Sequence, residues 1–96
     1  MDAVIVANSP AFDAAPFREL LGRAGLLIAA DGGGNALAAI GVVPHAVVGD
    51  LDSLRPEAVA AFAAAGAAIM RHPPDKDETD LELALLHAVA MGAERI

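Results

Sequence analysis

The sequence predicts an open, doubly wound (Rossmann-like) α/β fold, in which helices cover both faces of a mostly parallel sheet. Four short apolar runs rich in β-branched residues recur at intervals of about twenty residues. They are AVIVA (3–7), LLIAA (26–30), HAVVG (45–49) and AAIMR (67–71). Because their apolar residues are continuous rather than alternating, we expect strands buried on both faces. Helical segments follow each run, so the order favours parallel strands joined by right-handed crossovers.

The composition agrees with one small, closely packed domain. The chain has 96 residues, of which 56% are hydrophobic, but only 3 are aromatic. A domain of this size can bury one core. We expect that core to be built from Val, Leu, Ile and Ala side chains.

The first predicted helix lies in DAAPFRELLGRAG (13–25), where Asp13 can cap the start and Gly25 can end the helix. Its predicted buried face has four members: Phe17, Leu20, Leu21 and Ala24. The second, at about 34–41, is short and alanine-rich and is stopped by Gly41. The third begins at Pro56 and runs toward Gly66.

The fourth predicted helix begins at TDLE (79–82), where Thr79 and Glu82 have the spacing of a capping box. Its predicted buried face has four members: Leu81, Ala84, Leu85 and Ala88. In the last segment, MGAERI (91–96), a glycine stands where the helix should end and an apolar residue where a fifth strand should begin. We therefore expect this chain to be the N-terminal portion of a longer protein.

The charge pattern excludes several classes of function. There are 13 acidic and 6 basic residues, a net charge of −7, so the chain lacks the basic surface that nucleic-acid binding requires. Without cysteine there is no thiol nucleophile or disulfide framework. No signal peptide or run of 18 apolar residues is present in the sequence, which predicts a cytoplasmic protein without membrane contact.

The polar clusters all follow predicted strands. They are NSP (8–10), DGGGN (31–35), DLDS (50–53) and HPPDKDETD (72–80). In open parallel sheets, ligands bind outside the carboxyl ends of the strands, where these segments converge. The sequence therefore predicts one ligand site along this edge.

The glycines of DGGGN would let the backbone approach a phosphate or a sugar closely. An alternative of about equal weight is a tight strand-to-helix turn capped by Asp31 or Asn35.

In GDLDS, Asp50 and Asp52 would project to the same side of an extended backbone, close enough to share a cation. Mg²⁺ favours such a site of one or two carboxylates together with waters and phosphates. The alternative is that Ser53 or Asp52 caps the helix at Pro56. A cap leaves Asp50 unexplained, so we favour the metal site.

In DKDETD, a helix start explains Thr79, Asp80 and Glu82, because acids are favoured at that end of a helix. It does not explain the density of acids, which would repel one another without a cation. Lys76 could then meet a phosphate oxygen.

Three motifs in order, ADGGGNAL (30–37), VGDLDS (48–53) and DKDETDLELAL (75–85), resemble the N-terminal catalytic domain of thiamine pyrophosphokinases. The resemblance spans about residues 4–96. It implies an enzyme that transfers a pyrophosphoryl group from ATP to the hydroxyl of thiamine, giving thiamine pyrophosphate and AMP with Mg²⁺. We also weigh a pterin or other alcohol as acceptor, and a fragment that binds nucleotides without turnover.

The resemblance also implies roles for individual residues. The implied Mg²⁺ ligands are Asp50, Asp52 and Asp80. The implied nucleotide or substrate contacts are Asp31, Gly32, Gly33, Asn35 and Ser53, with Lys76, Asp77 and Thr79 on the ATP side. One carboxylate not engaged by metal, Asp50 or Asp77, would orient the thiamine hydroxyl or accept its proton.

The family has a further glycine-rich motif with Arg and Asp, and a C-terminal β-sandwich domain that helps to bind thiamine across a homodimer. Residues 1–96 contain neither. The resemblance therefore implies an incomplete catalytic domain at 1–96, inactive alone, from a homodimeric full-length protein.

Overall fold

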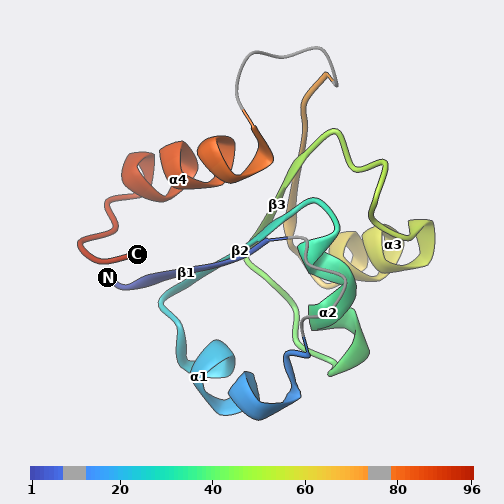
Figure 1. Ribbon diagram of the computed structural model, residues 1–96, viewed down its shortest axis with the longest axis horizontal. Helices are drawn as coiled ribbons and strands as arrows, with labels where there is room; N and C mark the ends of the chain where they lie inside the picture. The colour runs from blue at the N-terminus through green and yellow to red at the C-terminus, as the bar shows by residue number, and fades with distance from the viewer. Residues whose placement is uncertain (8–12, 74–78) are drawn as a thin grey trace.

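The computed structural model describes residues 1–7, 13–73 and 79–96 (Figure 1). Within these residues the strands are β1 (Ala3–Val6), β2 (Leu26–Ala30), β3 (Ala46–Gly49) and β4 (Ala68–Arg71). The helices are η1 (Ala15–Phe17), α1 (Arg18–Arg23), α2 (Gly33–Ala39), α3 (Pro56–Ala64) and α4 (Asp80–Ala90). All four predicted strands and all four predicted helical segments are therefore present, with boundaries that shift by one or a few residues.

The strands form one parallel sheet in the order β1-β2-β3-β4. The register pairs Ile5 with Ile28 and Val47 with Ile69, so every strand points the same way. The carboxyl ends of the strands consequently meet at one edge of the sheet. This confirms the predicted parallel α/β architecture.

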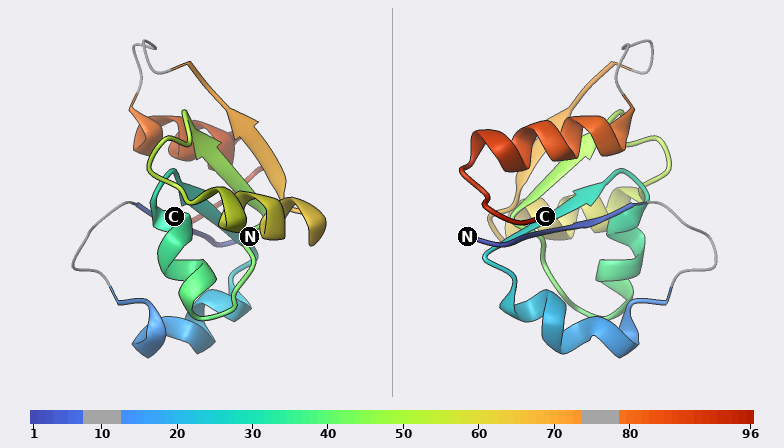
Figure 2. Two further views of the ribbon diagram at one scale, coloured as in Figure 1. Left: turned by 90° about the vertical axis from the view of Figure 1, so that its right-hand side faces the viewer. Right: turned by 60° about the vertical axis from the view of Figure 1, so that its left-hand side comes forward.

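The helices cover both faces of the sheet unequally. The helices that connect consecutive strands, α1, α2 and α3, lie on one face, and α4 lies on the other (Figure 2). Crossovers of the same hand between strands added in sequence must fall on the same face, which explains the first group. α4, the next helix after β4, lies on the opposite face and contacts β1, β2 and β3.

Alternate residues of β1, β2 and β3 supply two cores. The prediction of burial on both faces is wrong for β4, an edge strand, in which only Ile69 and Met70 are partly buried. On the face of α1, α2 and α3, the buried strand residues include Val6, Leu27, Ala29 and Val47. On the face of α4, they include Ala3, Leu26, Ile28, Ala46 and Val48. This explains why the strands are continuously apolar in sequence, since both faces are covered.

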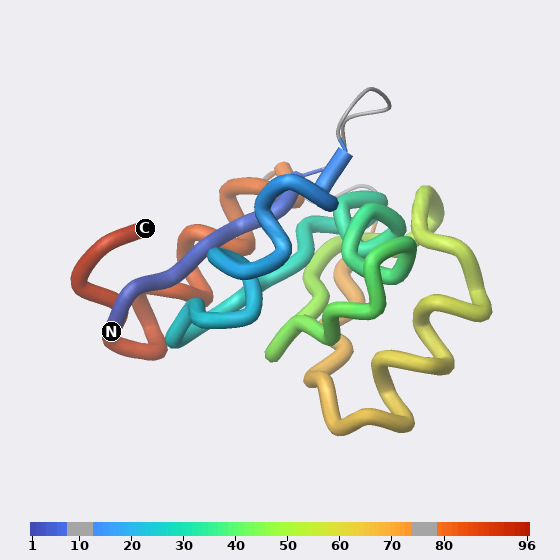
Figure 3. Tube along the Cα trace, turned by 90° about the horizontal axis from the view of Figure 1, so that it is seen from below, coloured from blue at the N-terminus to red at the C-terminus, as the bar shows by residue number. Residues whose placement is uncertain are grey.

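The chain ends beside its beginning (Figure 3). The backbone N–H of Ala3 donates to the carbonyl oxygen of Arg95 at 2.7 Å, and Asp2 and Arg95 form a parallel bridge. The Arg95 guanidinium also pairs with the Asp2 carboxylate at 2.8 Å. Arg95 therefore lies beside the start of β1, next to the position where the sequence predicts a fifth strand to begin.

The predicted buried faces of two helices need correction. In the first, Leu21 is buried, but Phe17 and Leu20 are 47% and 54% exposed. The reason is that this segment is a 3-10 turn, η1, followed by the six-residue α1, so the predicted spacing of one continuous helix does not hold.

In α4, Ala84 and Ala88 are fully buried, whereas Leu81 and Leu85 are 46% and 38% exposed. The two alanines let the helix lie close against the sheet, and the leucines fall at its flanks. Among the described residues, no helix has the length and apolar character needed to cross a bilayer.

Candidate active site

Three carboxylates meet at the carboxyl edge of the sheet. Asp31 follows β2, Asp50 follows β3, and Asp80 is the first residue of α4. One oxygen from each lies within 4.8 Å of the others. We refer to Asp31, Asp50 and Asp80 as the carboxylate cluster. Its spacing lets the three side chains reach one small cation.

Asp31, which follows β2, is held in place by the neighbouring strand β3 and by the loop that follows β3. It is only 5% exposed, and its backbone adopts a φ of 45°, which aspartate tolerates better than most residues. Its N–H donates to the carbonyl oxygen of Val48 at 2.8 Å. The N–H of Ser53 donates to its Oδ1 at 3.2 Å. The carboxylate is therefore fixed beneath the loop after β3.

The environment of Asp31 opposes its negative charge. Burial, then a hydrogen bond with Asp50 and the charges of Asp80 and Asp50, raise the pKa of Asp31 from 3.8 to about 6. The Ser53 N–H acts in the opposite direction and lowers it. A cation bound among the three carboxylates would remove this repulsion.

Asp80 packs directly against Gly49, the last residue of β3. A Cβ at position 49 would lie 2.8 Å from both Cγ and Oδ1 of Asp80, and Gly49 has a φ of 133°. Only glycine fits both conditions. The sequence analysis did not single out Gly49, although a glycine between an apolar strand and an acid is a detectable signal.

The capping box predicted for the fourth helix is present and sets the position of Asp80. The N–H of Glu82 donates to Oγ1 of Thr79 at 3.1 Å, and the Thr79 hydroxyl donates to Oε1 of Glu82 at 3.3 Å. Thr79 thus fixes the first turn of α4, and Asp80 is the next residue. The Thr79 hydroxyl is thus bonded within its own helix, and its predicted place on the ATP side stays a prediction.

The backbone between Asp50 and Asp52 is not extended, so the predicted same-side geometry is wrong. Leu51 has a φ of 68° and is 5% exposed, because the turn directs it into the core. The N–H of Asp52 donates to Oδ1 of Asp50 at 3.2 Å. Asp52 is exposed on the turn, with Oδ1 at 3.5 Å from Oγ of Ser53, and lies outside the carboxylate cluster.

The helix caps considered as alternatives at two other positions are not observed. The residue before α3 is Arg55, and neither it nor Ser53 or Asp52 makes a side-chain cap in the described structure. The residue before α2 is Gly32, again without a side-chain cap from Asp31 or Asn35. Both helices begin after turns that other contacts stabilise.

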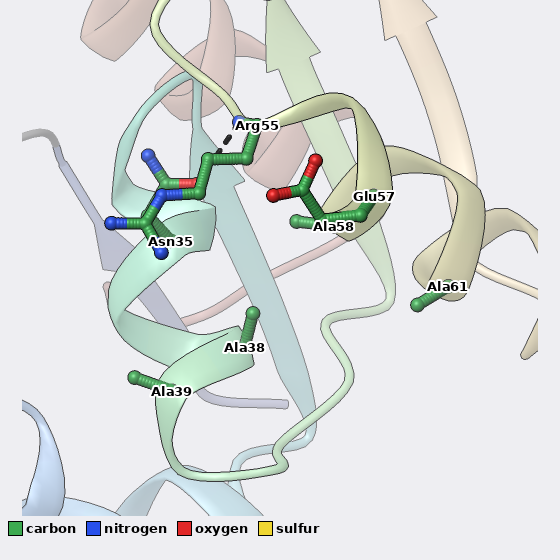
Figure 4. Close-up of a pocket in the computed structure, with 7 residues that line it drawn as sticks. All are labelled: Asn35, Ala38, Ala39, Arg55, Glu57, Ala58 and Ala61. Atoms are coloured by element: carbon green, nitrogen blue, oxygen red, sulfur yellow. Dashed lines mark hydrogen bonds between the residues drawn. The ribbon is translucent and has the colours of Figure 1, made fainter.

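Asn35 makes one of those contacts. Its Nδ2 donates to the carbonyl oxygen of Ser53 at 2.9 Å. Its Oδ1 accepts from the N–H of Arg55 at 3.1 Å (Figure 4). The side-chain amide therefore joins α2 to the loop after β3. The nitrogen and the oxygen of the Asn35 amide each make one of these hydrogen bonds.

The glycines at the start of α2 allow close packing within the protein. Gly32 and Gly33 are both buried. A Cβ on Gly33 would overlap the backbone carbonyl of Val6, and one on Gly34 would lie 2.9 Å from Cδ1 of Leu54. The close approach predicted for a ligand is thus made by the chain's own backbone at Gly33.

Arg71 lies near the carboxylate cluster, and a groove lies apart from it between α2 and α3. Nη1 of Arg71, at the end of β4, lies 3.5 Å from the carbonyl oxygen of Asp50. Arg71 was not among the predicted site residues. The β3–β4 register pairs Gly49 with Arg71 and so places Arg71 beside Asp50. A shallow groove between α2 and α3 is separate from the cluster and is lined by Asn35, Ala38, Ala39, Arg55, Glu57, Ala58 and Ala61 (Figure 4).

Three predicted segments or residues fall outside the described residues. They are Lys76, Asp77 and the NSP segment (8–10). The roles of Lys76 and Asp77 on the ATP side of the site stay predictions, as does the place of NSP at the ligand edge.

The fold and the site together define an α/β protein with an acidic cluster at the carboxyl edge of a parallel sheet. That arrangement is suited to a hard divalent cation and its phosphate ligands. A family model described as "Thiamin pyrophosphokinase, catalytic domain" matches residues 17–96. The chain belongs to this family, as its three motifs predicted.

Solved structures agree with this family. Thiamin pyrophosphokinase from Geobacillus thermodenitrificans is 30% identical, with a TM-score of 0.73 over 98% of this chain and 44% of that one. The Bacillus subtilis enzyme is 27% identical, with a TM-score of 0.76 over 98% of this chain and 44% of that one. The yeast enzyme, 20% identical, shares the fold with a TM-score of 0.77 over 97% of this chain and 32% of that one.

This chain therefore spans less than half the length of these solved relatives. A comparison with curated protein sequences gave no match.

Proposed function

We propose that the protein transfers a pyrophosphoryl group from ATP to the hydroxyl of thiamine, with thiamine pyrophosphate and AMP as products. The observation that carries the proposal is the carboxylate cluster at the carboxyl edge of a sheet that belongs to the thiamin pyrophosphokinase family. The site contains no cysteine and needs none, because this chemistry depends on positioning and charge neutralisation.

The residues present fit a Mg²⁺ ion. Asp31, Asp50 and Asp80 would hold it, because their oxygens lie within 4.8 Å of one another and Gly49 leaves room for the Asp80 carboxylate. The sequence predicted Asp50, Asp52 and Asp80, so Asp31 is added to that set. Asp52 stays a proposed ligand or phosphate-side acid on the adjoining exposed turn. When bound, the ion supplies positive charge to the phosphate oxygens.

The reaction requires the thiamine hydroxyl oxygen to bond to the β-phosphorus of ATP. The bond from that phosphorus to the oxygen bridging the α- and β-phosphates breaks, and AMP leaves. A carboxylate that does not bind the ion accepts the hydroxyl proton. Because Asp50 belongs to the proposed ligand set, Asp77 is the proposed acceptor. Lys76 and Thr79 are proposed on the ATP side, with Asp31, Gly32, Gly33 and Ser53 along the nucleotide or substrate edge.

The rest of the thiamine site is proposed to come from outside residues 1–96. The family resemblance implies a C-terminal β-sandwich domain and a homodimer, and this chain spans 44% of the Bacillus subtilis enzyme. The 96 residues alone are accordingly expected to be inactive.

The products of the native protein test the proposal. Supplied with ATP, Mg²⁺ and thiamine, it should form AMP and thiamine pyrophosphate in equal amounts, as followed by ³¹P NMR. Chelation of Mg²⁺ with EDTA should stop the reaction. Formation of ADP would contradict the proposal, and AMP release only with a different alcohol, such as a pterin, would contradict thiamine as the acceptor.

A further inference from the structure

Asn35 connects α2 to the loop that carries part of the carboxylate cluster. Its side chain is half-buried and donates to the Ser53 carbonyl at 2.9 Å while accepting from the Arg55 N–H at 3.1 Å. An amide presents a donor and an acceptor side by side, as a peptide group does. Bonded to two backbone groups of one loop, it restricts both the position and the rotation of that loop.

The loop held by Asn35 is in turn bonded to the cluster. Ser53 is fixed on both sides, because its carbonyl accepts from Asn35 and its N–H donates to Oδ1 of Asp31 at 3.2 Å. Closer to β3, the N–H of Asp52 donates to Oδ1 of Asp50 at 3.2 Å. A shift of this loop therefore moves the partners of both Asp31 and Asp50.

Arg71 and two leucines also hold the loop. Nη1 of Arg71 lies 3.5 Å from the carbonyl oxygen of Asp50, at the end of the loop next to β3. Leu51 and Leu54 are buried at 5% and 4% exposure, which holds the loop against the core. Apolar packing, unlike a hydrogen bond, does not fix the orientation of the backbone. The start of α3 at Pro56 also lacks a side-chain cap. At Ser53 and Arg55, the part of the loop nearest α3, the hydrogen bonds to described residues outside the loop and α3 are those with Asn35 and Asp31.

We propose that Asn35 is a positioning residue, which orients the Ser53–Arg55 backbone and thereby sets the separation of Asp31 and Asp50. The proposal rests on the proposed function in one respect, the binding of a divalent cation by the carboxylate cluster. It replaces the ligand contact that the family resemblance implies for Asn35 with a role inside the protein. Partners of this kind behind metal ligands commonly change metal affinity by 10- to 100-fold.

Two substitutions remove the amide in different ways. Asn35→Ala deletes both hydrogen bonds, and Asn35→Leu deletes them while keeping a side chain of similar size. Ala39→Ser, on the exposed side of the same helix, is the matched control. The native protein is used throughout, with whatever sequence it carries beyond residues 1–96.

The first measurement is amide hydrogen exchange without metal. Both Asn35 variants should exchange faster at residues 51–55, with unchanged exchange in the strands. The second is Mn²⁺ affinity from the electron paramagnetic resonance signal of free Mn²⁺. It should weaken by about 10-fold or more in both variants, and saturating metal should restore kcat. The control should match wild type in both.

Several outcomes would overturn the proposal. One is unchanged exchange and unchanged Mn²⁺ affinity in the Asn35 variants. Another is a raised KM for ATP at unchanged Mn²⁺ affinity, which would assign Asn35 a direct nucleotide contact. If Asn35→Ala does not fold, Asn35→Leu decides. Failure of the wild type itself to bind Mn²⁺ or to form AMP would instead overturn the proposed function, so the two failures are distinguishable.

Discussion

At the scale of single residues, the cluster is shaped by backbone conformations that few residues adopt. Asp31 and Leu51 have φ values of 45° and 68°, and Gly49 has 133°. Each turns the chain at or next to a carboxylate, and such conformations cost of order 1–3 kcal/mol for residues other than glycine. The motifs predicted Asp31 and Asp50 as site residues. The turns were not predictable, because they follow from contacts to Asp80, Val48 and the core.

Gly49→Ala should damage the site more than the fold. The added Cβ would lie 2.8 Å from the Asp80 carboxylate, and the φ of 133° is strained for alanine, so we expect a loss of about 1–3 kcal/mol in the free energy of unfolding. Mn²⁺ binding should weaken as Asp80 is displaced. Gly41→Ala is the control, because it also has a positive φ, 72°, but has open space around its Cβ. Equal Mn²⁺ affinity in both variants would contradict the role of Gly49.

The raised pKa of Asp31 predicts a pH dependence of stability. Because the folded pKa is about 6 and the ordinary value is 3.8, this carboxyl favours folding when it is protonated. Its contribution is present below about pH 4 and is lost as the pH rises through about 6. In EDTA at pH 7, Asp31→Asn should therefore unfold at a higher temperature than wild type.

The same comparison at pH 4, where wild-type Asp31 is protonated, should show a smaller difference between the two proteins. Mg²⁺ should stabilise wild type at pH 7 and have less effect on Asp31→Asn. Thermal unfolding followed by circular dichroism measures both proteins under all three conditions: pH 7 in EDTA, pH 4 in EDTA, and pH 7 with Mg²⁺. A variant less stable than wild type at pH 7 in EDTA would contradict the charge repulsion described here.

At the scale of elements, α4 shows what local sequence patterns can and cannot predict. The capping box at Thr79 and Glu82 was predictable, because it depends on residues three apart within one helix. Which apolar residues face the sheet depends on how closely the helix approaches. Ala84 and Ala88 are fully buried while Leu85 is 38% exposed, and a helical pattern alone does not distinguish them.

Ala84→Leu should therefore destabilise the protein by about 1–3 kcal/mol, because the larger side chain would push α4 away from the sheet. The change should also weaken Mn²⁺ binding, since Asp80 begins the same helix. Leu85→Ala, at an exposed neighbouring position, should cost less. Urea unfolding measures both. A larger loss for Leu85→Ala would show that the helix is rotated relative to this structure.

At the scale of the whole molecule, strand order brings distant parts of the sequence together. The parallel sheet and its functional edge were predictable, because alternating strands and helices leave few topologies. The pairing of Asp31 with Ser53, or of Asn35 with Arg55, was not predictable, because it depends on the exact turn after β3. The sequence therefore indicates which edge carries the site, and the structure indicates which side chains meet there.

The central claim is that the carboxylate cluster holds the divalent cation used in pyrophosphoryl transfer to thiamine. The most direct test measures AMP and thiamine pyrophosphate formation by the native protein across a Mg²⁺ titration, comparing wild type, Asp80→Asn and Glu19→Gln. Glu19→Gln is the control, because it removes the same charge from an exposed residue of α1. We predict that Asp80→Asn lowers the rate by about 100-fold or more, whereas Glu19→Gln matches wild type. Wild-type rates and Mg²⁺ dependence in Asp80→Asn would contradict the claim.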